Sequence, residues 1–255
     1  MIPIAFDRDL FERGGVFQPV GIDLRQRSMV LIVGPTGTGK THTTRYLLAN
    51  MAKAMPDVRI TIIDVKMYDF YPDFFDCPRC HGIDTALKGI KEFYSEFNER
   101  VRIGRVDSEM PRRVLLIDEY AAFAAMAAFE KKPDRKASSD DEDGNISIKE
   151  AMAIVARLLM TGRAYAQTLI VGCQRAQSDL FYGGSRDNFA NIIHMGNFSK
   201  EQRLMLASEY TDEILSDCGQ GQGYLLQSGK APRRIIVPRY DVERANALIR
   251  GALQY

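Results

Sequence analysis

The stretch VLIVGPTGTGKTHTTRYLL, residues 30–48, decides the fold. Residues 34–41 read GPTGTGKT and satisfy the pattern G-x-x-x-x-G-K-[ST], which binds phosphate. The apolar residues 29–33 predict a strand before the glycines, and the sequence after them is typical of a helix. A Gly/Thr-rich turn without chemical use is the alternative, but it would not require a strand and a helix on its two sides. The motif therefore predicts a nucleotide site.

The glycines allow backbone N–H groups to turn inward around a triphosphate. Lys40 is expected to reach the β and γ phosphates, and Thr41 is expected to ligate Mg²⁺. The residues expected to contact ATP are Gly34, Pro35, Thr36, Gly37, Thr38, Gly39, Lys40, Thr41 and His42.

Length and composition limit the function classes. The chain has 255 residues, of which 45% are apolar, so it can form one large domain but has little room for a second. With 34 basic and 33 acidic residues the net charge is +1, so a nucleic-acid site must be a local patch. Four cysteines, no signal peptide and no apolar run near 18 residues predict a cytoplasmic protein without direct membrane insertion.

Strand-like and helix-like segments alternate along the chain, which predicts an α/β fold with a mostly parallel central sheet and helices on both faces. Peripheral β-hairpins are expected within residues 16–24, at one sheet edge, and between 224–227 and 234–238. The expected strands are 58–64, 114–117, 168–174 and 191–195, and the expected helices are 83–105, 121–129, 151–160, 200–208 and 242–253.

The expected organisation has three parts. A β-rich lead-in spans residues 1–28, the ATPase domain spans 29–240, and a C-terminal helix lies within 241–255. Residues 130–150 carry opposed charge runs without an apolar cluster, which predicts a flexible, solvated insertion. Its basic residues are alternative contacts for a phosphate backbone, but the acidic half beside them weakens that interpretation.

Acidic and polar residues follow two of the expected strands. Asp118 and Glu119 end the strand 114–117, where a P-loop ATPase needs one carboxylate for Mg²⁺ and one to polarise the attacking water. An ordinary strand-end cap is the alternative. Gln174 ends the strand 168–174 and is a candidate sensor of the γ-phosphate.

The segment CPRCH, residues 77–81, superficially matches a c-type haem attachment site and half of a zinc site. Haem attachment requires export, and zinc requires further ligands, while Cys173 and Cys218 are isolated in the sequence. Incidental cysteines in an aromatic, acidic loop are the favoured interpretation. The roles of Cys77, Cys80 and His81 stay open.

Several further segments carry a resemblance to a known family. In order they are IIDVK (62–66), LLIDEYAAF (115–123), GRAYAQTLIVGCQRAQSDLFYGGSRDNFANII (162–193) and GQGYLL (221–226). They resemble the family's Ile-Asp-Pro-Lys, its hydrophobic-Asp-Glu-x-Ala run, its Gly-Arg-Ala to Ala-Asn segment and its late glycine turn. Together with the P-loop, they make the chain similar to the motor domain of the FtsK/SpoIIIE family, in the HerA/FtsK group of RecA-like ATPases.

The resemblance implies an ATP-driven, ring-forming motor that moves double-stranded DNA, with a homo-hexamer as the expected assembly. It implies that Arg163 reaches the nucleotide of a neighbouring subunit and that Gln174 is the sensor. The loop 175–186, with Arg175 and Arg186, is implied to face DNA. Arg163 as a helix-end cap, and Arg175 and Arg186 as solvated loop arginines, are the alternatives.

Departures from the family pattern favour a small member of this group. Val65 and Ala176 replace family prolines, residues 130–150 resemble an insertion, and the sequence shows neither membrane spans nor a winged-helix module. We expect a conjugation or mobile-element motor with a membrane-anchored or relaxase partner. A nucleotide-switched coupling or scaffold protein and a protein-translocating secretion ATPase are the alternatives.

Overall fold

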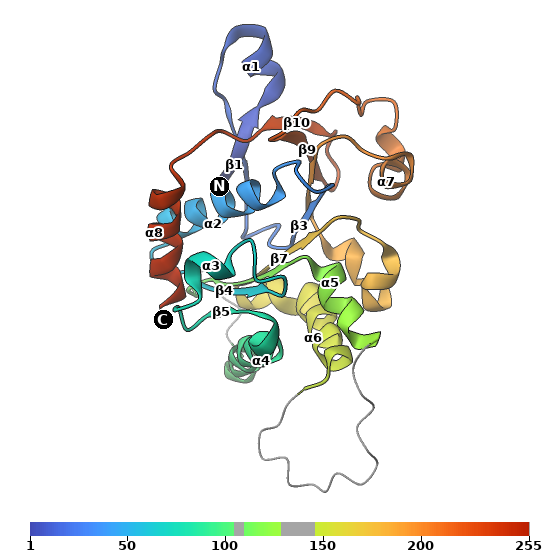
Figure 1. Ribbon diagram of the computed structural model, residues 1–255. Helices are drawn as coiled ribbons and strands as arrows, with labels where there is room; N and C mark the ends of the chain where they lie inside the picture. The colour runs from blue at the N-terminus through green and yellow to red at the C-terminus, as the bar shows by residue number, and fades with distance from the viewer. Residues whose placement is uncertain (105–109, 129–145, 255) are drawn as a thin grey trace, which may run out of the picture.

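The computed structural model describes residues 1–104, 110–128 and 146–254. Within these residues, ten strands form one sheet in the order β2-β1-β10-β9-β8-β3-β7-β6-β4-β5 (Figure 1). The strands are β1 (Ile2–Asp7), β2 (Pro19–Ile22), β3 (Val30–Val33), β4 (Arg59–Asp64), β5 (Cys80–His81), β6 (Arg113–Asp118), β7 (Gln167–Cys173), β8 (Asn191–Met195), β9 (Gln222–Gln227) and β10 (Arg233–Ile236). The helices are α1 (Arg8–Gly14), α2 (Lys40–Ala54), α3 (Tyr71–Phe74), α4 (Ala86–Ile103), α5 (Tyr120–Ala125), α6 (Ile148–Thr161), α7 (Lys200–Leu206) and α8 (Val242–Leu253).

One part of the sheet is parallel. β8, β3, β7, β6, β4 and β5 all run in the same direction, and β3 lies between β7 and β8. The carboxyl ends of these strands therefore meet at one edge, where α/β folds place their ligands. The predicted α/β class with a mostly parallel sheet is confirmed.

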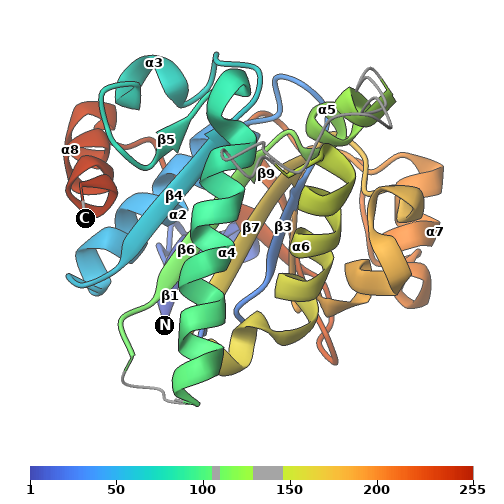
Figure 2. The same ribbon diagram turned by 90° about the horizontal axis from the view of Figure 1, so that it is seen from below.

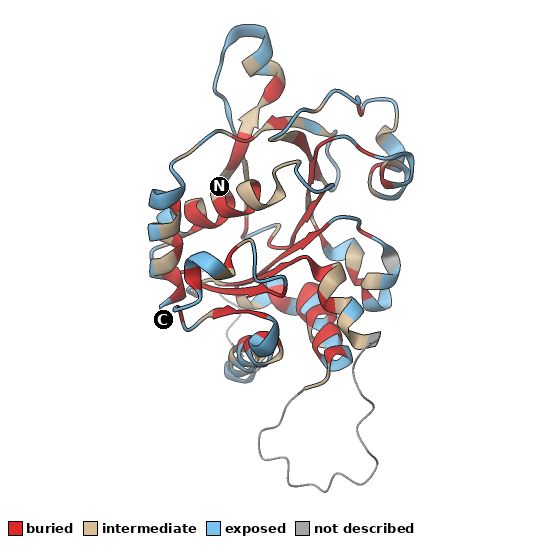
Figure 3. Cartoon of the chain, in the orientation of Figure 1, coloured by how far each residue is buried: buried red, intermediate tan, exposed pale blue. Residues whose placement is uncertain are grey.

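Helices cover both faces of the sheet (Figure 2). Alternate residues of β3 point to opposite cores: Val30 and Ile32 pack with α2 and α8, and Leu31 and Val33 pack with α4 and α6. Burial on both faces explains why this strand is uniformly apolar. The buried residues accordingly follow the sheet and the inner sides of the helices (Figure 3).

The other part of the sheet is antiparallel and joins the two ends of the chain. β9 pairs with β8 and β10, and β1 lies between β10 and β2. The hairpin predicted within residues 16–24 is wrong, because only β2 lies there and its partner is β1. The missed helix α1 separates them, with the Asp7 side chain accepting from Leu10 N–H at 3.0 Å. The later hairpin, β9 with β10, is confirmed.

The aromatic segment after β4 is anchored by burial. Phe70 and Phe74 are fully buried between the sheet and α8. Cys77 and Cys80 are buried in the same core, and the Cys77 Sγ accepts from the Arg250 guanidinium at 3.4 Å. In the part of the chain that the structure describes, no three His, Cys, Asp or Glu side chains form a group that could hold a metal ion. These contacts give the CPRCH cysteines a packing role.

His194, in β8, makes stability depend on pH. Burial lowers its pKa to about 4, and the ring stacks on Phe198 with centroids 3.6 Å apart. The unfolded chain binds this proton near pH 6.5, so the stabilisation is complete above that pH and is lost as the pH falls towards 4. We expect the free energy of unfolding to drop by about 2 kcal/mol between pH 7 and pH 5 through this group. In His194→Gln, urea titrations at the two pH values should show that much less pH dependence; an unchanged difference would contradict this expectation.

The predicted charged insertion, residues 130–150, can be compared with the structure only at its end. Most of the predicted charged insertion, with its basic residues Lys131, Lys132, Arg135 and Lys136, lies outside the described residues. The predicted end of the insertion at residue 150 falls within the first turn of α6, where Ser147 and Glu150 form a capping box.

Among the described helices, none has the length and apolarity that a bilayer crossing requires.

Candidate nucleotide site

The P-loop connects the buried strand β3 to α2 at the carboxyl edge of the sheet. Gly34, Gly37 and Gly39 have φ values of 152°, 81° and 104°, which side chains rarely adopt. At Gly34 a Cβ atom would also lie 2.2 Å from the carbonyl oxygen of Met195 in β8. The backbone of residues 34–39 can take this path only because glycine stands at these positions.

Lys40 begins α2 and folds back over the loop. Its Nζ donates to the carbonyl oxygen of Pro35 at 3.1 Å, and the Thr38 hydroxyl donates to the same oxygen at 2.8 Å. Burial lowers the pKa of Lys40, and the negative charges of Glu119 and Asp118 oppose that shift. The ammonium group therefore lies inside the loop, close to the two acids.

Three carboxyl groups gather at the carboxyl ends of β4 and β6. The Thr41 hydroxyl donates to Asp69 Oδ1 at 2.9 Å, and Asp69 hydrogen-bonds to Asp118. Burial, together with the charges of Asp69 and Asp64, raises the pKa of Asp118 to about 8. Asp64 itself accepts the backbone N–H groups of Asp69 and Phe70 at 3.0 and 2.8 Å, which fixes the loop that carries Asp69.

This oxygen-rich group fits Mg²⁺. Asp69 and Asp118 supply two adjacent carboxyl groups, and the hydroxyl of Thr41 completes a set of hard donors. Mg²⁺ in nucleotide sites takes one or two carboxylates together with phosphate oxygens and water, so a cage of three acidic ligands is not required. A divalent cation would also favour the charged form of Asp118, whose pKa is raised by burial and by the neighbouring carboxyl groups.

Glu119 occupies a special backbone position. It follows β6 with φ 56°, in the left-handed region, and its side chain is only 9% exposed. Lys66 Nζ lies 2.9 Å from Glu119 Oε2, and the backbone N–H of Gln174 donates to Glu119 Oε1 at 3.3 Å. Both carboxylate oxygens therefore have a donor.

These groups line one cavity of about 410 Å³. Its lining residues are Thr36, Gly37, Gly39, Lys40, Thr41, His42, Lys66, Tyr68, Asp69, Asp118, Glu119, Gln174 and Gln220. A second, more apolar cavity of about 540 Å³ shares Gly39, His42 and Gln220 with it and adds Phe6, Phe11 and Phe17. The first cavity offers cations and N–H groups, and the second offers aromatic rings.

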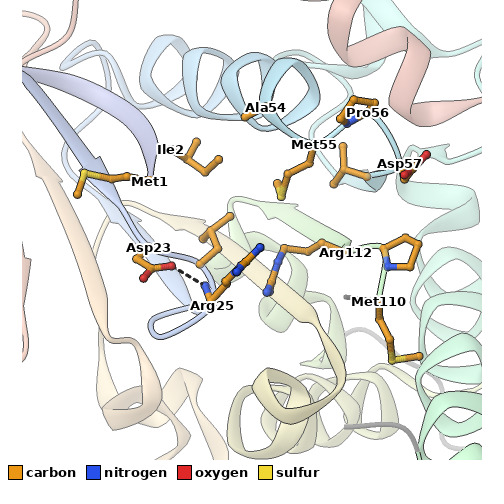
Figure 4. Close-up of a pocket in the computed structure, with 13 residues that line it drawn as sticks. Met1, Ile2, Asp23, Arg25, Ala54, Met55, Pro56, Asp57, Met110 and Arg112 are labelled. Atoms are coloured by element: carbon orange, nitrogen blue, oxygen red, sulfur yellow. Dashed lines mark hydrogen bonds between the residues drawn. The ribbon is translucent and has the colours of Figure 1, made fainter. Parts of the chain in front are cut away.

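A larger cavity of about 630 Å³ lies at the opposite edge of the sheet, against the amino ends of β4 and β6. Figure 4 shows Arg25 and Arg112 directed into it, with Asp23 and Asp57 at its rim. No glycine is among its described lining residues, so it lacks the backbone cradle of the P-loop. Size alone therefore does not identify the nucleotide site.

The structure brings most of the predicted site residues together, but not all of them. Arg163 lies at the amino end of β7, away from the cavity of its own chain, and donates to the Gln26 carbonyl oxygen at 3.2 Å. Arg175 is exposed directly after β7, whereas Arg186 donates to the Ala176 carbonyl oxygen at 3.3 Å. His42 lines the cavity, with its ring 4.2 Å from that of Tyr240.

Sequence reasoning missed four of the residues that line the cavity, namely Lys66, Tyr68, Asp69 and Gln220. Two of them contact other groups of the site: Asp69 accepts from Thr41, and Lys66 pairs with Glu119. Asp69 lies five positions after Asp64 in a turn-rich stretch, where no motif marks it. Lys66 is the last residue of the IIDVK segment (62–66), but nothing in that segment indicates an ion pair with Glu119. A position directly after a strand that neighbours β6 was the available signal, since parallel strands bring their carboxyl ends together.

Comparison with known sequences gives the following relatives. The family described as "Helicase HerA, central domain" matches residues 14–139. Protein Tra of Streptomyces lividans is 27% identical over 207 residues, which cover 77% of this chain and 32% of Tra. DNA translocase FtsK of Helicobacter pylori is 25% identical over 227 residues, which cover 84% of this chain and 25% of FtsK. The chain thus spans between a quarter and a third of the length of these relatives.

Comparison with solved structures agrees on the fold. The pCW3 conjugation coupling protein TcpA, solved with ATPγS, superposes with a TM-score of 0.69 and 18% identity, over 97% of this chain and 73% of TcpA. The type VII secretion ATPase EccC of Thermomonospora curvata gives 0.64 and 15%, over 94% of this chain and 26% of EccC. At these identities the likeness establishes a common P-loop ATPase fold.

Proposed function

We propose that this chain, which matches the HerA central domain over residues 14–139 and has Tra and FtsK proteins among its homologues, is an ATP-driven motor that moves double-stranded DNA. The observation that carries the proposal is the meeting of Lys40, Thr41, Asp118 and Glu119 in one cavity. ATP hydrolysis needs a phosphate-binding cation, ligands for Mg²⁺ and a carboxylate for the attacking water. The chain supplies each of them at the carboxyl edge of its parallel sheet.

ATP would lie across the two adjoining cavities. The triphosphate would take the P-loop N–H groups and Lys40, which would turn from the Pro35 carbonyl oxygen to the phosphates. The base would enter the apolar cavity beside His42, which shares Gly39 with the phosphate cavity. This arrangement accounts for both the polar and the aromatic linings.

Hydrolysis would be an in-line attack by water on the γ-phosphate. Asp118 and Thr41 would hold Mg²⁺, which supplies charge neutralisation of the phosphate oxygens when bound. Glu119 would polarise the water, and Gln174 would sense the γ-phosphate from the neighbouring strand end. Each of these groups stands at the end of a strand or at the start of a helix. Small shifts of the adjoining loops would therefore change how the groups align with the γ-phosphate.

Arg163 would act on a neighbouring copy of the chain. It lies at the amino end of β7 and the cavity lies at the carboxyl end, roughly 20 Å away along the strand, so it cannot serve its own site. A ring in which each copy presents Arg163 to the next, most simply a homo-hexamer, would complete every site. Hydrolysis would then depend on assembly.

Duplex DNA is the proposed polymer because homologues of this chain are named DNA translocases. Arg175, exposed beside the cavity, would contact the phosphate backbone, and Arg186 would support the same loop. Conjugative DNA transfer is the proposed setting, since the structural neighbour TcpA is a conjugation coupling protein. A membrane-anchored or relaxase partner would then recruit the motor.

The deciding experiment measures ATP turnover with and without duplex DNA at low and high salt. We expect DNA to raise turnover, and the effect to fall as salt rises, because the contacts are to phosphates. A chain that hydrolyses ATP but ignores DNA would favour the secretion ATPase alternative, for which EccC is a structural precedent. A chain that binds ATP and turns it over only negligibly under all conditions would favour a nucleotide-switched scaffold.

A further inference from the structure

The carboxylate of Glu119 is held from two sides. Lys66 donates to Oε2 at 2.9 Å and the backbone N–H of Gln174 donates to Oε1 at 3.3 Å. A carboxylate polarises water through an oxygen lone pair that faces the water, and here each oxygen of Glu119 already accepts from a donor. In this arrangement Glu119 is therefore restrained.

The two donors come from strands on opposite sides of β6. Lys66 follows β4 and Gln174 follows β7, while β6 pairs with both. Glu119 itself has φ 56°, a conformation that costs free energy in a residue other than glycine and persists only where its surroundings hold it. The two contacts thus connect the position of Glu119 to two separate loops.

One of these loops leads to the exposed Arg175. Lys66, Glu119 and Gln174 line an open depression of about 360 Å³ together with Arg175 and Gln177, and they also line the nucleotide cavity. Because Arg175 follows Gln174 directly, a ligand that pulls on Arg175 moves the N–H group bonded to Glu119. The depression and the nucleotide cavity therefore share Lys66, Glu119 and Gln174.

We propose that Lys66 is a positioning residue that keeps Glu119 out of its working geometry until duplex DNA engages the loop that begins at Arg175. The inference rests on the proposed function, because it assumes that Glu119 polarises the attacking water. Movement of Gln174 removes one contact, and the remaining ion pair with the 40% exposed Lys66 then opens to solvent. Duplex DNA would thus stimulate ATP turnover by releasing Glu119 from Lys66 and from the Gln174 N–H group.

The test compares steady-state turnover of wild type, Lys66→Met and Lys66→Arg with and without duplex DNA. Methionine keeps the length of the side chain but removes its charge. We expect basal kcat to rise about threefold to tenfold in Lys66→Met, as the loss of a partly exposed ion pair allows, and the stimulation by DNA to shrink correspondingly. Lys66→Arg should keep low basal turnover and strong stimulation.

Lys88→Met is the matched control, because Lys88 pairs with Glu92 on the exposed side of α4 at 3.9 Å. It should behave as wild type. Binding of a fluorescent ATP analogue shows that each variant is folded. If Lys66→Met binds the analogue but loses turnover with DNA, or keeps the wild-type ratio of stimulated to basal rates, the inference is wrong. If wild type itself is not stimulated by DNA, the proposed function fails instead.

Discussion

Glu119→Gln should bind ATP with wild-type affinity and lose turnover by a factor of about 10² to 10⁴, the usual contribution of a positioned general base. The amide keeps the size of the side chain and can still accept the N–H of Gln174, now 3.3 Å from Oε1. It cannot take a proton from water, and it loses the charge attraction to Lys66. Steady-state ATPase assays with duplex DNA, beside equilibrium binding of a fluorescent ATP analogue, measure the two effects separately.

Glu92→Gln is the control for this variant. Glu92 lies on the exposed side of α4 and carries the same substitution without contact to the cavity. It should retain full turnover. Retention of turnover in Glu119→Gln would assign the attacking water to another group, and a joint loss of binding and turnover would indicate damage to the fold of the loop.

Arg163→Ala should reduce turnover about a thousandfold in the assembled protein, because an arginine supplied across a subunit boundary stabilises the charge of the transferring phosphoryl group. The side chain is exposed and donates a hydrogen bond to the Gln26 carbonyl oxygen, so the expected loss of stability is about 1 kcal/mol or less. Turnover measured with urea unfolding separates the catalytic loss from any structural one.

Mixing provides the decisive control for Arg163. Rings formed from Arg163→Ala and Glu119→Gln copies would contain sites with an intact Glu119 in one copy and an intact Arg163 in the next. With random mixing of equal amounts, roughly a quarter of the sites would recover turnover. The opposite outcome, no recovery in mixtures that co-assemble by light scattering, would limit Arg163 to capping the segment at Gln26.

The parallel part of the fold could be predicted because its signals are local. The central strands are rich in apolar residues, as in the VLIV of β3 and the VLLI of β6, and β8 begins and ends at the predicted residues 191 and 195. α6 begins three residues before the predicted residue 151, because the Ser147 and Glu150 capping box fixes its start. Such pairs act over one helical turn and are visible in the sequence.

The β9–β10 hairpin of the antiparallel extension was predictable, but the pairing of β1 was not, because it is decided by distant residues. Phe6 in β1 pairs with Ile236 in β10, and no turn motif connects the two. A hairpin was instead expected next to Gly21, where only one strand lies. Local glycine and proline signals identify a turn but not the strand that will pair across it.

In the candidate site, too, some residues are predictable from local motifs and others are brought in only by the folded structure. The P-loop and the acids after β6 are motif positions whose chemistry follows from residue type and spacing. Asp69 and Lys66 enter the site through the path of the loop after β4, which Asp64 and Arg45 fix by hydrogen bonds to its backbone at 2.8 Å and 2.7 Å. That path depends on packing across the sheet, so no motif marks either residue as part of the site.

The pairing of β1 with β10 has a consequence for synthesis. β1 is synthesised long before residues 233–236 of β10. During this interval β1 lacks the strand with which it pairs in the folded protein. Sequence separation of this size slows folding, and the uncovered strand edge meanwhile attracts other nascent chains. Loss of β10 would leave β1 paired with β2 alone in the described sheet and would expose an apolar strand edge to other chains.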